Sequence, residues 1–545
     1  MCSSRDPLLL VLTAACFILP IPAVASDIPA AALQPSRSTT YITTTWLDAN
    51  RVKLNLTNVG TLNERAGNRN GGGYWPDSTN PRENVILFDL GPWVVGKLNG
   101  VPMMGISQWG SSYSPGPAIN GQPARIAKPE DSLRYRTYKI NRGDDATTST
   151  DYREWPVDLG APVDLLGRPR VFGDQTLWSV FNNFDPAAAS GPWPTNMPNP
   201  GLPVVIQQTV YALNVAGSKP TALLNNVAFI EWKIVNAGTA TIESTYVSLW
   251  TDIDFGDASS NRPAVDTAHQ LGYCWQARDD AYATPRAIGF VLLHGPAVPA
   301  PGSEAMFMGQ QRPGFRNLPL SGFWGILDDS YLDTQFQGPA YSMATAWNIT
   351  RGFDKLGNPI IDSVTHEVTT FPYGGDPVSN TGWIATRSSG GAGFNMFTGP
   401  FTLSPGDSQW VMFALVPVSD STRFGAITRL RQAAAALRAM PYTTIAPTGV
   451  DEQSAIVPTR LRLDQNYPNP FNPSTTIRYG IPARSHVRLT VFNTLGQHVA
   501  TLQNGEQNAG DHDVRFDARG LPSGVYVYQL QADGRTAAKL FLLLR

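Results

Sequence analysis

The sequence predicts an all-β protein: a mainly antiparallel β-sandwich body with one closing helix, followed by a second, small β-sandwich domain. Three observations predict this class. Gly (49) and Pro (45) are frequent among the 545 residues, and charged residues make up 15% of the chain, against roughly 25% in an average soluble protein. Apolar residues come in short runs rich in β-branched and aromatic side chains. One segment alone has a convincing helical spacing.

Four apolar runs of the body have the composition expected of strands in an antiparallel sandwich core. They are residues 227–235, 245–250, 287–293 and 409–416. The first of these runs and residues 241–249 flank Asn236-Ala237-Gly238, which is a turn signal. The sequence therefore predicts a hairpin between these two strands.

The closing helix is predicted over residues 422–440. Its apolar residues recur at helical spacing, at Phe424, Ile427, Leu430, Ala434, Leu437 and Met440. Asp420 or Ser421 is expected to cap the first turn, and Pro441 to end the helix. The small, polar and Pro-containing residues 441–458 then predict a linker.

The chain is expected to have four parts. These are a signal peptide (1–25), a β-rich body (26–440), the linker (441–458) and a C-terminal domain (459–545). The composition of the body allows a division into two subdomains, with a break near residues 200–225.

The N-terminal segment has the features of an export signal. The apolar run at residues 8–21 is too short to cross a bilayer, and Ala23-Val24-Ala25 follows it as a cleavage pattern. Lipidation at Cys16 is the alternative. After cleavage Cys274 is the one remaining cysteine, and its apolar neighbours predict a buried side chain.

The charge balance argues against some partners. The chain has 41 basic and 43 acidic residues, a net charge of −2, and no basic field to hold a phosphate backbone. Nucleic acid is therefore not an expected partner. No later segment approaches the ~18 apolar residues of a membrane-spanning helix, so no transmembrane segment is expected.

The C-terminal domain has the clearest strand pattern. Apolar residues alternate in residues 486–491, 513–517 and 524–531, and Asp533-Gly534 is a strong hairpin signal before the last run. About six or seven short strands in this length predict a small Ig-like sandwich.

Three motifs stand in order along this domain. They contain Asn466, Tyr467, Pro468, Asn469, Pro470, Phe471, Asn472 and Pro473, then Gly496, then Gly520, Leu521, Gly524 and Tyr526. With these motifs the domain resembles the C-terminal sorting domain of the type IX secretion system of Bacteroidetes-like bacteria. The alternative is an ordinary Ig-like module that stays on the mature protein.

The resemblance implies several properties. It implies that an outer-membrane translocon is the partner of this domain, and that the protein is secreted across the outer membrane to the cell surface or the medium. It also implies that the domain is then removed or replaced by an anchor. The body resembles large exported proteins with the same tail, which implies no known activity.

One acidic cluster of the body has the character of a metal site. Asp252, Asp254 and Asp257 follow a predicted strand, and Asp266 lies nearby. Carboxylates on one loop form an oxygen-rich cage that suits Ca²⁺. The spacing is not that of an EF-hand, because Pro263 stands at the twelfth position. The alternative is a solvated Asp-rich turn. No other cofactor is indicated.

Aromatic residues suggest surface glycans as a further partner. Several tryptophans lie in Gly- and Pro-rich surroundings: Trp75, Trp93, Trp109, Trp155, Trp178 and Trp193. Flat rings of this kind can stack on sugars, and the alternative is that they pack in the core.

The sequence favours a structural or adhesive exported protein and leans away from an enzyme. It contains no paired zinc histidines, no nucleophile elbow and no phosphate-binding loop. The alternatives are a secreted hydrolase of polysaccharide or protein and a non-catalytic carbohydrate-binding protein. A Ser-His-Asp triad needs no closeness in sequence, so sequence alone leaves the enzyme question open.

Overall fold

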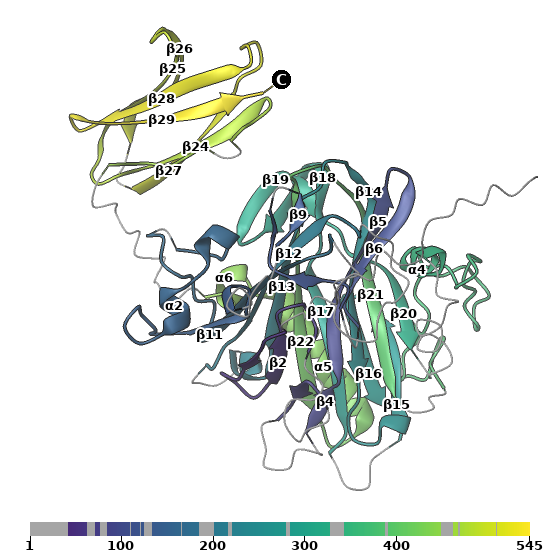
Figure 1. Cartoon of the computed structure of the whole chain (residues 1–545). Helices are drawn as coiled ribbons and strands as arrows, with labels where there is room; N and C mark the ends of the chain where they lie inside the picture. The colour runs from purple at the N-terminus through teal and green to yellow at the C-terminus, as the bar shows by residue number, and fades with distance from the viewer. Residues whose placement is uncertain are drawn as a thin grey trace, which may run out of the picture.

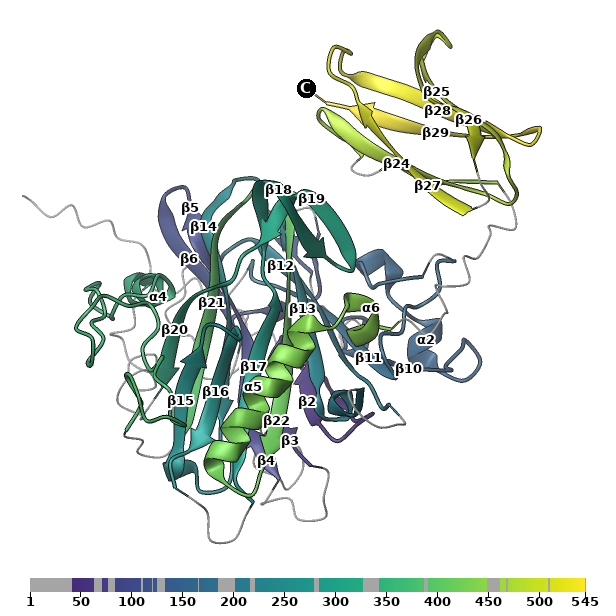
Figure 2. The ribbon, with the colours of Figure 1, turned by 180° about the vertical axis from the view of Figure 1, so that it is seen from behind.

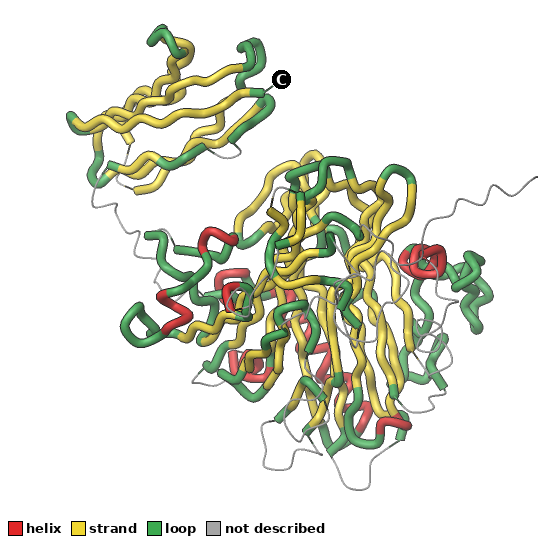
Figure 3. Tube along the Cα trace, viewed as in Figure 1, coloured by secondary structure: helices red, strands yellow, loops and turns green. Residues whose placement is uncertain are grey.

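The computed structural model describes residues 42–62, 71–76, 84–108, 111–119, 121–124, 133–164, 166–184, 201–215, 221–278, 284–326, 343–386, 391–447, 461–466, 469–507 and 510–544. Most of these residues lie in antiparallel strands and few lie in helices (Figure 3). The predicted all-β class is confirmed. The predicted signal peptide and Cys16 lie outside the described residues.

The larger sheet of the body has nine strands in the described part of the chain, and all its pairings are antiparallel. In spatial order they are β10 (Tyr138–Asn141), β11 (Gln175–Asn182), β12 (Val204–Ala212), β13 (Ala228–Asn236), β22 (Ser408–Ser419), β17 (Arg286–His294), β16 (Leu271–Gln276) and β15 (Asn261–Asp266), with β7 (Ser114–Pro115) beside β11. The central strands are buried over most of their length, so both faces of the sheet are covered.

A second sheet of five strands packs against the first. Its order is β20 (Leu320–Ile326), β21 (Ala392–Leu403), β14 (Ile242–Ile253), β5 (Asp89–Leu98) and β6 (Val101–Ile106). Ile230 and Trp232 of β13 belong to one buried cluster with Phe394 and Met396 of β21. Because successive strand residues point to opposite faces, the alternate residue Phe229 joins a different cluster on the far side of the larger sheet.

Helix α5 (Arg423–Ala439) covers that far side, where it crosses β16, β17 and β22 (Figures 1 and 2). Its buried residues are Ala426, Ile427, Leu430, Ala433, Ala434 and Leu437. The helix lies close to the sheet at Gly289, where an added Cβ would be 3.1 Å from Leu430 Cδ2. The cap is Thr422, whose Oγ1 accepts a hydrogen bond from the Gly425 N–H at 3.0 Å. The expected caps were wrong, because Asp420 instead bonds Ser421 and pairs with Arg429.

Smaller elements cover the remaining surfaces. Helix α4 (Met343–Thr350) places Trp347 and Ile349 against Trp250 and Trp324 on the outer face of the five-stranded sheet. The other helical turns are α2 (Thr150–Arg153), η1 (Val157–Leu159), η3 (Thr221–Asn226), η4 (Ala258–Ser260) and α6 (Tyr442–Ile445). None of the described helices has the length and apolar character needed to cross a bilayer.

Three small sheets complete the body. They are β1 (Thr44–Leu47), β2 (Lys53–Thr57), β3 (Gly73–Tyr74) and β4 (Val85–Leu87); β8 (Ala118–Ile119) and β9 (Gln122–Pro123); and β18 (Ala297–Phe307) and β19 (Gln310–Asn317). The first of them extends the main core, since Leu54 and Leu87 belong to the same buried cluster as the facing sheets.

The predicted hairpin around Asn236-Ala237-Gly238 is wrong. The two strands exist as β13 and β14, but β13 pairs with β12 and β22, whereas β14 pairs with β5 and β21. The connection therefore passes from one sheet to the other. Both strands are largely buried and have apolar residues on both faces, so their sequences do not reveal which neighbour each one takes. Asn236 fixes the crossing by donating from Nδ2 to the carbonyl oxygens of Ala240 and Leu403, at 2.9 and 2.8 Å.

The sheets continue across the region where the sequence allowed a subdomain break. Strand β12 lies within that region and joins β11 to β13 in one sheet. At the start of the predicted linker, Tyr442 and Ile445 of α6 are buried against the body. The division into domains otherwise stays a prediction.

The C-terminal domain is a small sandwich of three and four antiparallel strands. The sheets are β23 (Arg462–Leu463), β24 (Ser474–Ile481) and β27 (Gly510–Asp517), and β26 (His498–Gln507), β25 (Ser485–Asn493), β28 (Gly524–Ala532) and β29 (Arg535–Leu543). Its buried side chains form a cluster of their own, which includes Ile477, Leu489 and Tyr528.

Replacing Leu430 by Ala tests the packing of α5. Leu430 is fully buried, so the change removes apolar contacts and leaves a cavity, and we expect a loss of about 2–5 kcal/mol in the free energy of unfolding. Thr428→Ala on the exposed side of the same helix is the control and is expected to change it by less than about 0.5 kcal/mol. Urea denaturation measures both, and equal losses would contradict the packing.

Candidate functional site

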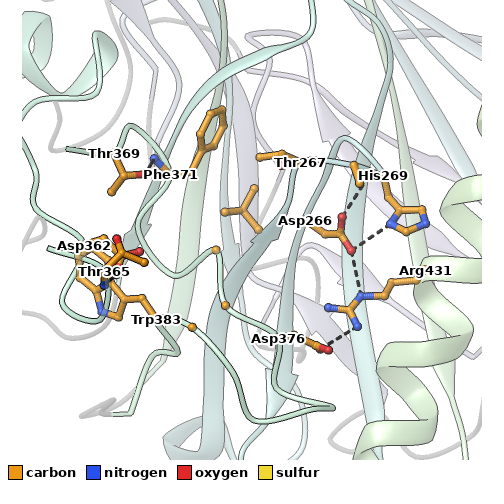
Figure 4. Close-up of a pocket in the computed structure, with 15 residues that line it drawn as sticks. Asp266, Thr267, His269, Asp362, Thr365, Thr369, Phe371, Asp376, Trp383 and Arg431 are labelled. Atoms are coloured by element: carbon orange, nitrogen blue, oxygen red, sulfur yellow. Dashed lines mark hydrogen bonds and ion pairs between the residues drawn. The ribbon is translucent and has the colours of Figure 1, made fainter. Parts of the chain in front are cut away.

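A pocket of about 640 Å³ lies at the edge of the larger sheet (Figure 4). Three parts of the body form it: the end of β15 with the following turn, the long loop 351–386, and one side chain of α5. The loop is held in place by backbone hydrogen bonds from Val265 N–H to Tyr373 O (3.2 Å) and from Phe323 N–H to Thr370 O (2.9 Å). The volume of the pocket is within the usual range for small-molecule sites.

One wall of the pocket is an ion-pair network centred on Arg431 of α5. Its guanidinium contacts Asp266 Oδ2 at 2.9 Å through Nε and Asp376 Oδ1 at 2.8 Å through Nη1. Asp266 Oδ2 also lies 3.0 Å from His269 Nδ1. The side chains of Arg431 and Asp266 are only 21% and 14% exposed, so the network is fixed rather than freely solvated.

The opposite wall comes from the loop, with Asp362, Thr365 and Thr369 and the rings of Phe371 and Trp383 (Figure 4). Asp362 Oδ1 accepts hydrogen bonds from the backbone N–H groups of Val364 and Thr365, at 2.8 and 2.9 Å. This Asx turn holds the carboxylate at the pocket surface.

The pKa values of two of these carboxyl groups are lowered. Partial burial opposes ionisation of Asp376, but hydrogen bonds from Ser379 and the pair with Arg431 outweigh it and lower its pKa to about 2. The backbone N–H of Thr365 is the main cause that lowers the pKa of Asp362. Both groups are therefore anions at neutral pH.

The aspartates of the predicted calcium site take part in different interactions. Asp252 lies in β14 opposite Asp89. Burial raises the pKa of the fully buried Cys274, and Asp254 and Asp252 make smaller contributions to this rise. Asp266 belongs to the pocket network described above.

Asp257 caps the short helix η4. Its Oδ1 accepts hydrogen bonds from Ser259, and its Oδ2 pairs with Arg278. Among the described residues, no three His, Cys, Asp or Glu side chains gather in a way that could hold a metal ion. The calcium site stays a prediction from sequence, without support from a common cage.

The tryptophans that suggested a glycan-binding face are packing residues wherever they are described. Trp93 and Trp178 are fully buried, and Trp75 and Trp155 are 5% and 6% exposed. Trp109 and Trp193 lie outside the described residues. Trp383, which lines the pocket, was not among the six.

A second ionisable cluster is sealed beneath α6. Glu231 of β13 is 5% exposed; its Oε2 accepts from Trp410 Nε1 and its Oε1 from the Tyr442 hydroxyl, both at 3.0 Å. Burial raises the pKa of Glu231 despite these hydrogen bonds. The ring of His294 stacks on Trp410 at 5.4 Å, and burial lowers the pKa of this histidine to about 4.

In the C-terminal domain, the motif residues connect the first segment of the domain, residues 466–473, to strands that are distant in the sequence. Asn466 is 2% exposed; its N–H donates to the Tyr528 hydroxyl at 2.9 Å and its Nδ2 to Thr475 Oγ1 at 3.0 Å. Asn469 Oδ1 accepts from the N–H of Leu542 at 2.8 Å.

Phe471 continues this attachment. It forms a parallel bridge with the last strand, and its ring meets Phe541 edge-on at 5.1 Å. Pro470 and Pro473 flank it, each after a cis peptide bond, and the latter follows Asn472. The bridge and the ring contact of Phe471 hold the segment against β29.

Two motif glycines have backbone conformations that other residues rarely adopt. Gly496 and Gly520 have φ angles of 76° and 98°, in the left-handed region. Leu521 follows the second turn and packs partly buried on the domain core. Tyr467 and Pro468 lie outside the described residues.

The last motif fixes the start of β28, at Gly524. Tyr526 stacks on Phe541 at 5.4 Å, and its hydroxyl donates to the carbonyl oxygen of Pro522 at 2.8 Å. The motif residues that are described thus build the domain.

Residues 465–543 match the family described as "Secretion system C-terminal sorting domain". The C-terminal domain is a type IX secretion sorting domain. The sorting domain directs export across the outer membrane, so the protein reaches the cell surface or the extracellular space. It also implies an interaction with the secretion machinery.

Comparison with curated proteins gave no match. Among solved structures, the chain has a weak likeness to a polysaccharide lyase (9% identity, TM-score 0.18, 64% of this chain and 36% of that one) and to a heparinase III (7%, 0.16, 70% and 34%). It spans about a third of the length of these two proteins. A third likeness is to PorZ, a surface component of the type IX secretion system of Porphyromonas gingivalis (10%, 0.13, 93% and 56%).

Replacing Glu231 by Gln and by Ala tests the buried carboxyl. Its raised pKa means that the folded state binds the proton more tightly than the unfolded state, so the wild-type free energy of unfolding falls as pH rises from about 4.5. Glu231→Gln is expected to flatten this fall and to equal or exceed wild-type stability at pH 7. Glu231→Ala leaves two buried donors unpaired and is expected to cost about 2–4 kcal/mol.

Denaturation at several pH values measures these changes. Glu243→Gln, at an exposed position of β14, is the control and is expected to change the free energy of unfolding by less than about 0.5 kcal/mol. Equal destabilisation by the Gln and Ala variants at pH 7 would contradict a penalty for the buried charge.

Proposed function

We propose that the body acts outside the cell as a non-catalytic surface protein that adheres to other surface material. Export by the sorting domain supplies the location. The observation that supports the rest is the state of two carboxylates in the pocket, Asp362 and Asp376, which are fixed and ionised rather than poised for proton transfer.

A general acid must hold its proton near the working pH, and enzymes raise carboxyl pKa values for this purpose. In the pocket the shift is in the opposite direction: the pKa of Asp376 is about 2, and that of Asp362 is also lowered. Arg431, fixed between Asp266 and Asp376, is one of the groups that lower the pKa of Asp376. These features suit binding of a polar ligand.

A secreted hydrolase of polysaccharide or protein is the second candidate, and Glu231 is the observation that favours it. Raised carboxyl pKa values cluster at active sites. Glu231, however, is sealed by Trp410 and Tyr442. A hydrolase that used this residue would need α6 to move aside to admit the substrate.

The full-length protein is expected to adhere without cleaving. We expect retention on surfaces coated with bacterial envelope polysaccharide, with no release of reducing ends from polysaccharides and no new peptides from casein. Chromatography and mass spectrometry of the supernatants measure cleavage. Hydrolysis by the wild type that is lost in Glu231→Gln would overturn the proposal in favour of the hydrolase.

A further inference from the structure

We propose that the pocket between β15, α5 and loop 351–386 binds a sugar that carries a free ammonium group. This inference rests on the proposed function and names the ligand class of the same pocket. It follows from three properties of the lining: an uncompensated negative charge, neutral hydroxyl groups and aromatic rings.

The charge of the lining is not balanced. Three carboxylates, of Asp266, Asp362 and Asp376, face one guanidinium, that of Arg431, so the excess is two negative charges when His269 is neutral. Arg431 is shared between Asp266 and Asp376. Two of the acids keep their charge to low pH because their pKa values are lowered. The pocket therefore disfavours uronic acids and sulfated sugars and attracts a cation.

Asp362 is the acid best placed to meet that cation. It lies on the wall opposite the Arg431 network (Figure 4) and forms no ion pair within the described residues. Its hydrogen-bond partners are the N–H groups of Val364 and Thr365 and the Thr365 side chain, and His366 is the histidine that interacts with it electrostatically. No Lys or Arg pairs with it within the described residues, so its charge is hydrogen-bonded rather than held in an ion pair. An ammonium on the ligand would form a charge-assisted hydrogen bond here.

The other lining groups suit the remainder of a sugar. Thr365 and Thr369 can donate to and accept from ring hydroxyls. Phe371 and Trp383 add aromatic surface, which attracts both sugar C–H groups and cations. Trp383 is fixed by Tyr373, whose ring lies 5.1 Å away at 62°. A simple cation would leave these hydroxyl groups unused.

Two oligosaccharides that differ only in the amine separate this proposal from its rivals. We would titrate the full-length protein with a glucosamine tetramer and with its N-acetylated counterpart by calorimetry, at a pH where the free amine is protonated. The glucosamine oligomer is expected to bind at least about tenfold more tightly, and added salt is expected to weaken it. Equal binding of the two oligomers would overturn the role of the charge.

Asp362→Asn is the decisive variant. Asn keeps an oxygen for the Asx turn and loses only the charge, so the fold is retained and the affinity for the glucosamine oligomer is expected to fall about five- to tenfold. Asp354→Asn is the matched control: Asp354 makes the same kind of turn, with the N–H groups of Leu356 and Asn358, but does not line the pocket. Undiminished binding by Asp362→Asn would overturn the assignment.

A tetralysine peptide tests whether charge alone is recognised. If it binds as tightly as the sugar, the sugar assignment fails. The two proposals fail in different ways. A body that adheres without cleaving but ignores both oligomers loses only the ligand assignment, whereas cleavage of the oligomers would remove the non-catalytic function itself.

Discussion

Both faces of the nine-stranded sheet are covered, and the rest of the body depends on this burial. Ile230 and Trp232 share a buried cluster with the five-stranded sheet, whereas Phe229 and Met412 belong to the cluster on the far side, which also contains the buried residues of α5. Side chains of this size contribute ~1.5–3 kcal/mol each when they leave water, which is why so few charges lie within the layers. Glu231 is an exception, and hydrogen bonds from Trp410 and Tyr442 compensate it. Most charges stay at strand ends and in loops, and the pocket forms there.

The class, four strands of the body and several strands of the C-terminal domain could be predicted, because β-branched and aromatic runs indicate buried strands. Strand pairing could not. Strands β13 and β14 have apolar residues on both faces, so neither their periodicity nor the intervening turn shows that they belong to different sheets. Local signals also failed at the cap of α5, where Asp420 is already engaged by Ser421 and Arg429.

The pocket could not be predicted either, because it too depends on contacts between distant parts of the chain. Asp266, Asp376 and Arg431 are 55 to 165 positions apart and meet only after loop 351–386 folds onto β15. The sequence predicts Asp266 as a calcium ligand because other acidic residues lie near it in the chain, whereas in the structure it pairs with the distant Arg431. Trp383 carries no local sign that it borders a cavity rather than a core.

A short sequence signal was available for several turns. Asp164, Asp354 and Asn493 each begin a turn of the form Asx-x-Leu-Gly, in which the side-chain oxygen accepts N–H groups two and four residues later. The glycines Gly167 and Gly357 have positive φ angles of 76° and 90°, which explains the choice of residue. The same physics shapes the body and the sorting domain.

In the sorting domain, the residues that define the family also close the sandwich. Asn466 and Phe471 connect the entering segment to β28 and β29, so recognition of the sequence pattern is also recognition of a fold. This explains why the C-terminal domain could be assigned from its sequence, whereas the activity of the body could not. The body's role outside the cell depends on this domain for delivery.

The most direct test of the account is to locate the protein in a host with a type IX secretion system, with and without residues 459–545. Fractionation and immunoblotting measure the amount outside the outer membrane. The full chain is expected on the cell surface or in the medium, and the truncated chain in the periplasm. Equal amounts of the two forms outside the cell would contradict sorting by this domain.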